Sequence, residues 1–125
     1  MQNLPEPLAG EIWDLAFDPR VGHEQGGFRP ALVVSNDEFN RTPNWLHIVV
    51  PITGTDRGIR YHVRIEPPEG GLTKPSVLMT GQVRAQSILR FRPRRGVVST
   101  DVLDRVAGHC LASTTPMPTG AGSSS

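Results

Sequence analysis

The sequence is poor in cysteine and contains no long apolar run. Its one cysteine, Cys110, cannot form a disulfide within the chain or a thiolate zinc cluster, and its apolar neighbours predict a small buried side chain. No apolar stretch reaches the roughly 18 residues of a membrane span. The N-terminus, MQNLPEPLAG, has neither a basic start nor an apolar signal core. We therefore expect a cytoplasmic protein with no membrane partner.

Lysine is almost absent, and one region has no acidic residue. Twelve of the 13 basic residues are arginine, and Lys74 is the single lysine. Arginine suits two-point contacts with phosphate better than lysine does. Residues 70–100 hold six basic side chains and no acid, whereas residues 1–24 hold five acids and one arginine. This asymmetry favours an anionic partner such as nucleic acid, although a basic run is more often solvated surface.

Metal-ligand spacing is also missing. The four histidines, His23, His47, His62 and His109, are scattered along the chain and form no motif with the cysteine or with carboxylates. We expect no metal and no cofactor.

The hydrophobic pattern predicts several short strands and one helix. Strands are expected over residues 10–17, 30–36, 45–53, 59–66 and 76–91, the last bent at Gly81, with an arginine-rich turn over residues 92–96. Pro51 favours an edge position for the third strand or a strand end near this residue. Ser99, Thr100 and Asp101 begin an amphipathic helix.

This content predicts one mostly β domain, a small SH3-like antiparallel barrel with a C-terminal α-helix. We expect an N-terminal lead-in over residues 1–8, the barrel domain over residues 9–112, and a disordered tail rich in proline, glycine and serine over residues 113–125.

The loop GHEQGGFRP, residues 22–30, concentrates polar and flexible residues between the first two expected strands. Its two adjacent glycines allow a sharp turn, and Pro30 holds Arg29 in an extended backbone. Arg29 is therefore expected at the mouth of a strand anchored by the apolar run ALVV. On composition alone, an idle surface ion pair between Glu24 and Arg29 is the more frequent outcome.

Five blocks of sequence together resemble the MazF/PemK family of toxin–antitoxin endoribonucleases. They are GEIW, GHEQGGFRPALVVSNDEFN, VVPIT, EGGLTKPSVLMTGQVR and STDVLDRVAGHCL, in the family's order over about residues 8–112. The resemblance implies a homodimer with an SH3-like barrel that cleaves single-stranded RNA without a metal. It also implies a partner, a cognate antitoxin protein whose segment occupies the RNA groove.

The resemblance also implies the site residues. Arg29 and Thr53 match the family's catalytic pair, and Glu24 matches a further position linked to activity. Phe28 is expected to bind RNA because bases stack on aromatic rings. The other expected RNA-binding residues are His23, Gln25, Gln82 and Arg84.

The sequence departs from the family pattern at two places. Gly54 stands where many members have a serine, and Ala85, Gln86 and Ser87 replace the usual run after QVR. Either departure could alter which bases fit the site.

The expected chemistry suits these residues. When the 2′-hydroxyl attacks the phosphate, the enzyme must accept a proton, neutralise the developing charge and protonate the leaving 5′-oxygen. Arg29 suits charge neutralisation, and the Thr53 hydroxyl can donate to the same phosphate. Glu24 is the best carboxylate for the base or for orienting Arg29. The proton acceptor stays open among Glu24, Arg29 and His23. We expect no histidine to be essential, with His23 and His62 as the candidates for an exception.

Two other functions fit the sequence. A toxin of the same barrel type could bind and poison a protein such as DNA gyrase without being an enzyme, acting through its terminal helix and not through Arg29. An inactive binding module is the second alternative, and the presence of both Arg29 and Thr53 argues against it.

Overall fold

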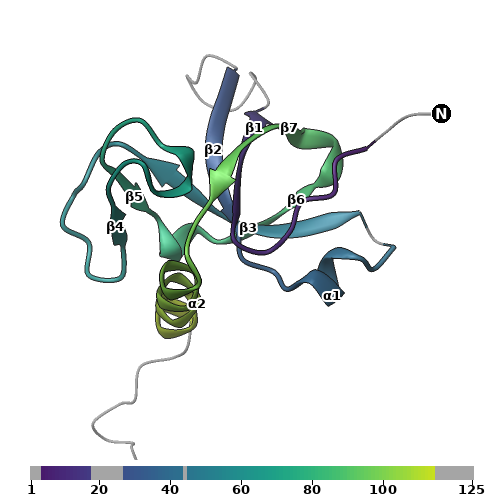
Figure 1. The fold of residues 1–125 in the computed structure, drawn as a ribbon. Coiled ribbons are helices and arrows are strands. Elements are labelled where there is room, and N and C mark those ends of the chain that lie inside the picture. The colour runs from purple at the N-terminus through teal and green to yellow at the C-terminus, as the bar shows by residue number, and fades with distance from the viewer. Residues whose placement is uncertain (1–3, 18–26, 44, 115–125) are drawn as a thin grey trace, which may run out of the picture.

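The computed structural model describes residues 4–17, 27–43 and 45–114, which form a curved antiparallel sheet and a C-terminal helix (Figure 1). The strands are β1 (Glu11–Phe17), β2 (Gly27–Val33), β3 (Leu46–Thr53), β4 (Val63–Ile65), β5 (Ser76–Leu78), β6 (Arg84–Ser87) and β7 (Phe91–Val97). The helices are α1 (Asp37–Asn40) and α2 (Thr100–Thr114), with 3-10 turns η1 (Glu69–Gly71), η2 (Thr80–Gln82) and η3 (Ile88–Arg90). The predicted fold class, mostly antiparallel β with a terminal helix, is confirmed.

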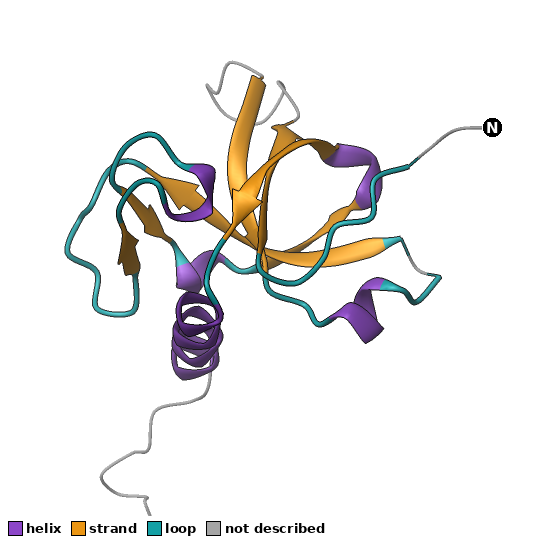
Figure 2. Ribbon diagram, viewed as in Figure 1, coloured by secondary structure: helices purple, strands orange, loops and turns teal. Residues whose placement is uncertain are grey.

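The sheet follows the order β4-β5-β3-β2-β1-β7, and β6 pairs with the first half of β3. Within the described residues no ladder joins β4 to β7, so the sheet is barrel-like but open (Figure 2). Residues 22–26 of the predicted glycine-rich loop and most of the predicted disordered tail lie outside the described residues, whereas residues 27–29, predicted as the end of that loop, already belong to β2. Helix α2 includes positions 113 and 114, which the sequence pattern places in that tail.

Strand β3 is central, which makes the edge position predicted for Pro51 wrong, whereas the alternative, a strand end near this residue, agrees with the end of β3 at Thr53. Leu46 to Val49 pair with β6, whereas Ile52 and Thr53 pair with β5. Pro51 lies where β3 changes partner on that side, so its missing N–H falls between the two ladders. Its carbonyl accepts a hydrogen bond from the Met79 N–H at 2.9 Å.

The predicted arginine-rich turn is instead strand β7. Its residues pair with β1, with register shifts on both sides of Trp13. These irregularities accommodate Pro93, which cannot donate to a regular ladder. The predicted strand over residues 59–66 shortens to β4, and Ile59 is exposed.

Apolar side chains are buried on both faces of the sheet. One cluster contains Ile12, Leu32 and Val50, and α2 contributes the fully buried Val106 to it. The smaller cluster on the alternate residues contains Leu15, Ala31, Val33, Val49 and Phe91.

Helix α2 lies against η2 and β4 (Figure 1). Its Cys110 is half-buried, not fully buried as predicted, and burial raises the pKa of its thiol. Within the described part of the chain, no helix has the length and apolar character to cross a membrane.

Candidate functional site

The acidic and basic regions of the sequence meet in space between β1 and β7. Arg94 pairs with Glu11 at 3.0 Å, and Arg95 pairs with Asp14 at 2.7 Å. The charge asymmetry along the sequence is therefore partly cancelled in the fold, and these two arginines have structural partners.

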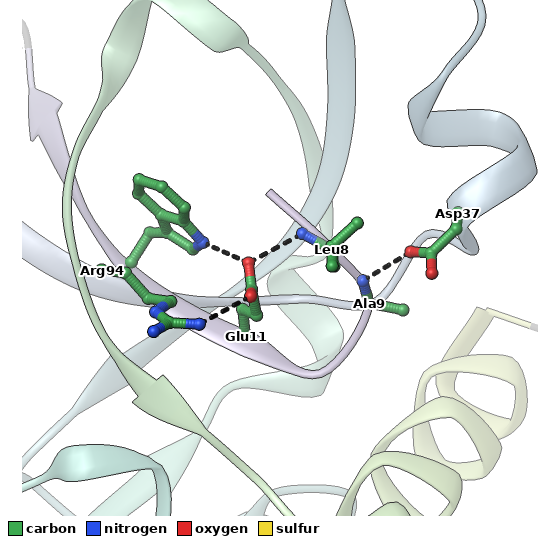
Figure 3. Close-up of polar contacts among 6 residues, drawn as sticks. Leu8, Ala9, Glu11, Asp37 and Arg94 are labelled. Atoms are coloured by element: carbon green, nitrogen blue, oxygen red, sulfur yellow. Dashed lines mark hydrogen bonds and ion pairs between the residues drawn. The ribbon is translucent and has the colours of Figure 1, made fainter. Parts of the chain in front are cut away.

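Glu11 is the centre of the first of these contacts (Figure 3). It is only 7% exposed, and its Oε1 accepts hydrogen bonds from the Leu8 N–H at 2.8 Å and the Trp13 indole N–H at 2.9 Å. Arg94 donates to Oε2 at 3.0 Å. Because a buried carboxylate needs such partners, this network fixes the lead-in segment to β1 and β7.

A pocket of about 410 Å³, which we call the cationic pocket, opens where β2 begins and β3 ends. Its walls come from β2, the end of β3, the segment after η1, and β7. It is lined by Arg29, Pro30, Ile52, Thr53, Gly54, Leu72, Thr73, Lys74, Ser76 and Arg95.

The register between β2 and β3 explains why Arg29 and Thr53 share this pocket. Ala31 lies opposite Pro51 in the ladder. Extending the antiparallel register by two residues brings position 29 opposite position 53, on the same face of the sheet. Arg29 is exposed and Thr53 is half-buried. The Thr53 hydroxyl oxygen accepts from the Thr55 N–H at 3.2 Å, so its own O–H can donate to a ligand.

A close backbone crossing builds the third wall. Gly71, with φ +76°, lies so near β7 that a Cβ would come within 2.1 Å of the Arg95 carbonyl oxygen. A Cβ on Gly96 would likewise come within 2.6 Å of the Gly70 backbone. Only glycine permits this approach. The crossing carries Thr73 and Lys74 to the pocket beside Arg95.

The pocket is positively charged. Arg29, Lys74 and Arg95 line it, and none of its described lining residues is acidic. Arg95 is already paired with Asp14, whereas Lys74 makes no ion pair with a described residue. A small anion such as a phosphate group suits an open pocket with these donors and the Thr53 hydroxyl.

The other predicted residues do not line this pocket. Phe28 is 60% exposed, and the Arg92 guanidinium lies 5.9 Å from the centre of its ring. Gln82 ends η2 and Arg84 begins β6, both exposed. The remaining predicted site residues, His23, Glu24 and Gln25, lie outside the described residues. Sequence reasoning missed Lys74 as a pocket residue, because no pattern among its neighbours shows that the glycine crossing brings it there.

A second pocket, of about 870 Å³, lies beneath the lead-in segment. We call it the histidine pocket, because His47 lines it while being only 2% exposed. Burial lowers the pKa of His47, against the opposing effect of a hydrogen bond with the Pro7 backbone. The neighbouring Trp45 is exposed and has a positive φ of 62°. Across residues 4–17, 27–43 and 45–114, no three His, Cys, Asp or Glu residues group as metal ligands.

Fold and pocket together define a small β-sheet protein with a cationic site for an anionic group at one end of the sheet. Comparison with known proteins identifies which class this is. A family model described as PemK-like, MazF-like toxin of type II toxin–antitoxin system matches residues 8–112. The chain belongs to this family, and the resemblance read from the sequence is confirmed.

Individual relatives agree with this assignment. Endoribonuclease EndoA of Bacillus subtilis (strain 168) is 29% identical over 98 residues, which is 78% of this chain and 84% of EndoA. Endoribonuclease PemK of Escherichia coli is 52% identical over 44 residues, a match that covers 35% of this chain and only 32% of PemK.

Solved structures show the same fold. A MazE–MazF complex from Deinococcus radiodurans superimposes with a TM-score of 0.72 at 31% identity, covering 86% of this chain and 95% of that chain. A mycobacterial endoribonuclease in complex with its cognate antitoxin has a TM-score of 0.70 at 22% identity, covering 90% and 99%.

Proposed function

We propose that this protein, as the toxin of a type II toxin–antitoxin system, is a metal-independent, sequence-selective endoribonuclease that cleaves single-stranded RNA. The observation that carries the proposal is the cationic pocket, in which Arg29 and Thr53 lie together with no described acidic lining residue. The names of the relatives support the activity, since PemK and EndoA are both endoribonucleases.

The proposed reaction is an attack of the 2′-hydroxyl on the adjacent phosphate. The bond from phosphorus to the 5′-oxygen breaks, and the departing 5′-oxygen takes up a proton from Arg29 or from water. This leaves a 2′,3′-cyclic phosphate on one product and a 5′-hydroxyl on the other. Arg29 donates to the non-bridging oxygens and neutralises the charge that builds on the phosphorane. The Thr53 hydroxyl donates to the same group. Glu24, Arg29 or His23 accepts the 2′-hydroxyl proton.

RNA on either side of the cut follows the surface outside the pocket. Phe28 offers an exposed ring to a base, and Arg92 backs that ring. Arg92 is itself held by donating to the carbonyls of Leu89 at 2.9 Å and Phe91 at 3.0 Å. The other proposed RNA contacts are His23, Gln25, Gln82 and Arg84.

The proposed partners follow the family. A cognate antitoxin protein covers the RNA surface in this proposal, and the existence of toxin–antitoxin complexes among the structural relatives supports such a partner. The proposed active form is a cytoplasmic homodimer. Light scattering of the purified protein tests the dimer, and co-expression with the product of a neighbouring short reading frame tests the antitoxin.

The decisive experiment measures cleavage of an RNA oligonucleotide in excess chelator. The wild type should cut and give products with a 5′-hydroxyl. Arg29→Ala should lose about 10²–10³-fold in kcat. An oligonucleotide with deoxyribose at the cut position should stay intact. Cleavage that needs added magnesium, or that survives Arg29→Ala, contradicts the mechanism.

The non-enzymatic alternative is not favoured, because the named relatives are endoribonucleases. It makes a different prediction for the same experiment: growth arrest with intact RNA, lost on changes in α2 and not on Arg29→Ala.

A further inference from the structure

We propose that Lys74 is a further substrate-contacting residue of the cationic pocket, whose ammonium binds the phosphate that Arg29 and Thr53 act on. The inference rests on the proposed function and adds a group that the sequence did not single out.

The backbone of Lys74 is held while its side chain is exposed. Leu72 and Ser76, on either side, are 5% and 6% exposed, and they anchor the segment in the protein. The Ser76 hydroxyl donates to the Lys74 carbonyl at 3.0 Å. Lys74 itself is exposed. The lysine is therefore presented from a fixed backbone into an open pocket, as a binding residue needs to be.

The lysine side chain lies across the residue that follows Thr53. A Cβ built on Gly54 would lie 3.4 Å from the Lys74 Cε and 3.6 Å from its Nζ. The ammonium is thus at ordinary contact distance from position 54, on the wall that carries Thr53. Gly54 is also where the sequence departs from the family resemblance, and a side chain there would pack directly against the lysine.

The charge of Lys74 is uncompensated within the described structure. Arg64, Arg94 and Arg95 pair with carboxylates, whereas the Lys74 ammonium makes no ion pair with a described residue. Arg29 supplies a flat fork for two oxygens, and an ammonium adds a compact charge on a flexible stem. Each of these two cations can contact a different oxygen of the same phosphate. Because the transition state carries more negative charge than the substrate, both contacts become stronger there and lower the barrier.

The first experiment compares Lys74→Met with Lys74→Arg in the full-length protein. The Met variant keeps the length of the stem without the charge, and we expect kcat/KM for RNA cleavage to fall about 10–100-fold. The Arg variant should retain activity within about 5-fold, because it keeps the charge. Thermal unfolding midpoints equal to that of the wild type exclude a general loss of structure.

The second experiment measures binding of a deoxyribose analogue of the cut oligonucleotide against salt concentration. A lost phosphate contact lowers the slope of log K against log salt by about 0.7 for a single strand. We expect that change in Lys74→Met and not in Lys74→Arg. A purely structural role for Lys74 would leave the slope unchanged.

The third experiment uses the fact that Lys74 is the only lysine of the chain. Amine acetylation followed by mass spectrometry of the Lys74 peptide reports on this side chain alone, and the bound analogue should slow acetylation about 5-fold or more. In addition, Gly54→Val should reduce cleavage in the wild type and have little effect in Lys74→Met, because both changes remove the same contact.

The outcomes separate the two proposals. Wild-type cleavage that is lost in Arg29→Ala but unchanged in Lys74→Met overturns the role of Lys74 and leaves the endoribonuclease standing. A wild type that does not cleave RNA overturns the endoribonuclease proposal. In that case, the salt slope and the acetylation protection still decide whether Lys74 binds phosphate.

Discussion

The histidine pocket is larger than the cationic pocket, but the cationic pocket has more charged side chains in its lining. The histidine pocket, at about 870 Å³, is the larger and is lined mainly by proline, leucine and aromatic side chains, with Arg41 and Glu6 as its charged residues. The cationic pocket, at about 410 Å³, has three basic lining residues and no acidic one among those described. A polyanion is recognised by converging charge and donors, so volume alone would select the wrong pocket.

The two pockets are also built differently. The cationic pocket depends on a backbone crossing at glycine, whereas the histidine pocket is roofed by the lead-in segment, which the Glu11 carboxylate and Asp37 hold through hydrogen bonds to the N–H groups of Leu8 and Ala9. Changes at one pocket should therefore leave the other intact.

The largest expected effect is that of Gly71→Ala, which disrupts the backbone crossing at the cationic pocket and leaves the histidine pocket unchanged. A Cβ at this position meets the Arg95 carbonyl at 2.1 Å on a backbone with φ +76°. We expect the free energy of unfolding to fall by about 2–5 kcal/mol, measured by urea denaturation. Gly81→Ala, with nothing within 4 Å of its Cβ, is the control and should change it by less than about 1 kcal/mol. Equal free energies of unfolding for Gly71→Ala and Gly81→Ala would contradict the requirement for glycine at the crossing.

The next largest expected effect is a loss of RNA cleavage in Thr53→Val, with Thr42→Val in the other pocket as its control. Thr53→Val removes the hydroxyl in the cationic pocket, and kcat/KM for RNA cleavage should fall about 10–100-fold, the value of one hydrogen bond to a charged group. Thr42→Val removes a hydroxyl from the histidine pocket, where it donates to the Phe39 carbonyl at 2.6 Å. That variant should cleave RNA at the wild-type rate. An equal loss of kcat/KM in both variants would contradict the assignment of RNA cleavage to the cationic pocket.

A smaller effect concerns pH and the histidine pocket. Burial lowers the pKa of His47 from 6.5, so below that pH the unfolded chain binds a proton that the folded chain resists. The free energy of unfolding should therefore be highest above about pH 6.5 and decline as the pH falls. The total loss is about 1.4 kcal/mol for each unit by which folding lowers the pKa of His47.

The measurement is the difference in unfolding free energy between pH 7.5 and pH 5.5. His47→Leu should show a smaller difference than the wild type, because it lacks the titrating group. An unchanged pH dependence in this variant would mean that His47 titrates normally in the folded protein.

The smallest expected effect lies outside both pockets. Gly108 is in α2, and a Cβ there meets nothing within 4 Å. Gly108→Ala should stabilise the protein by about 0.5–1 kcal/mol through better helix propensity, seen as a rise of a few degrees in the unfolding midpoint. RNA cleavage at 25 °C should not change. A loss of cleavage at unchanged stability would contradict the expectation that α2 is independent of the cationic pocket.

The strands and the terminal helix could be predicted because their patterns are local. Alternating or continuous apolar residues mark β1, β2 and β3, and the spacing of Val102, Val106 and Cys110 marks α2. Strand β7 could not be predicted, since its arginines and Pro93 read as a turn until β1 supplies acids opposite them. Glu11 and Arg94 are 83 residues apart in the chain, and no local pattern contains that pairing.

The candidate site divides in the same way. Family resemblance named Arg29 and Thr53, but only the register of β2 against β3 explains why they face one pocket. Lys74 could not be found from its neighbours, because its position depends on Gly71 crossing β7. The charge asymmetry misled for the same reason: a count along the chain cannot show that Arg94 and Arg95 already have partners.

Strand β3 reaches both pockets, with His47 near its start in the histidine pocket and Thr53 at its end in the cationic pocket. The two positions are six apart, so they share one face of the pleat. A slip of one residue against β2 would turn both side chains to the other face at once. An insertion or deletion in the turn before β3 that shifted its register by one residue would therefore displace the buried imidazole of His47 and the hydroxyl of Thr53 together.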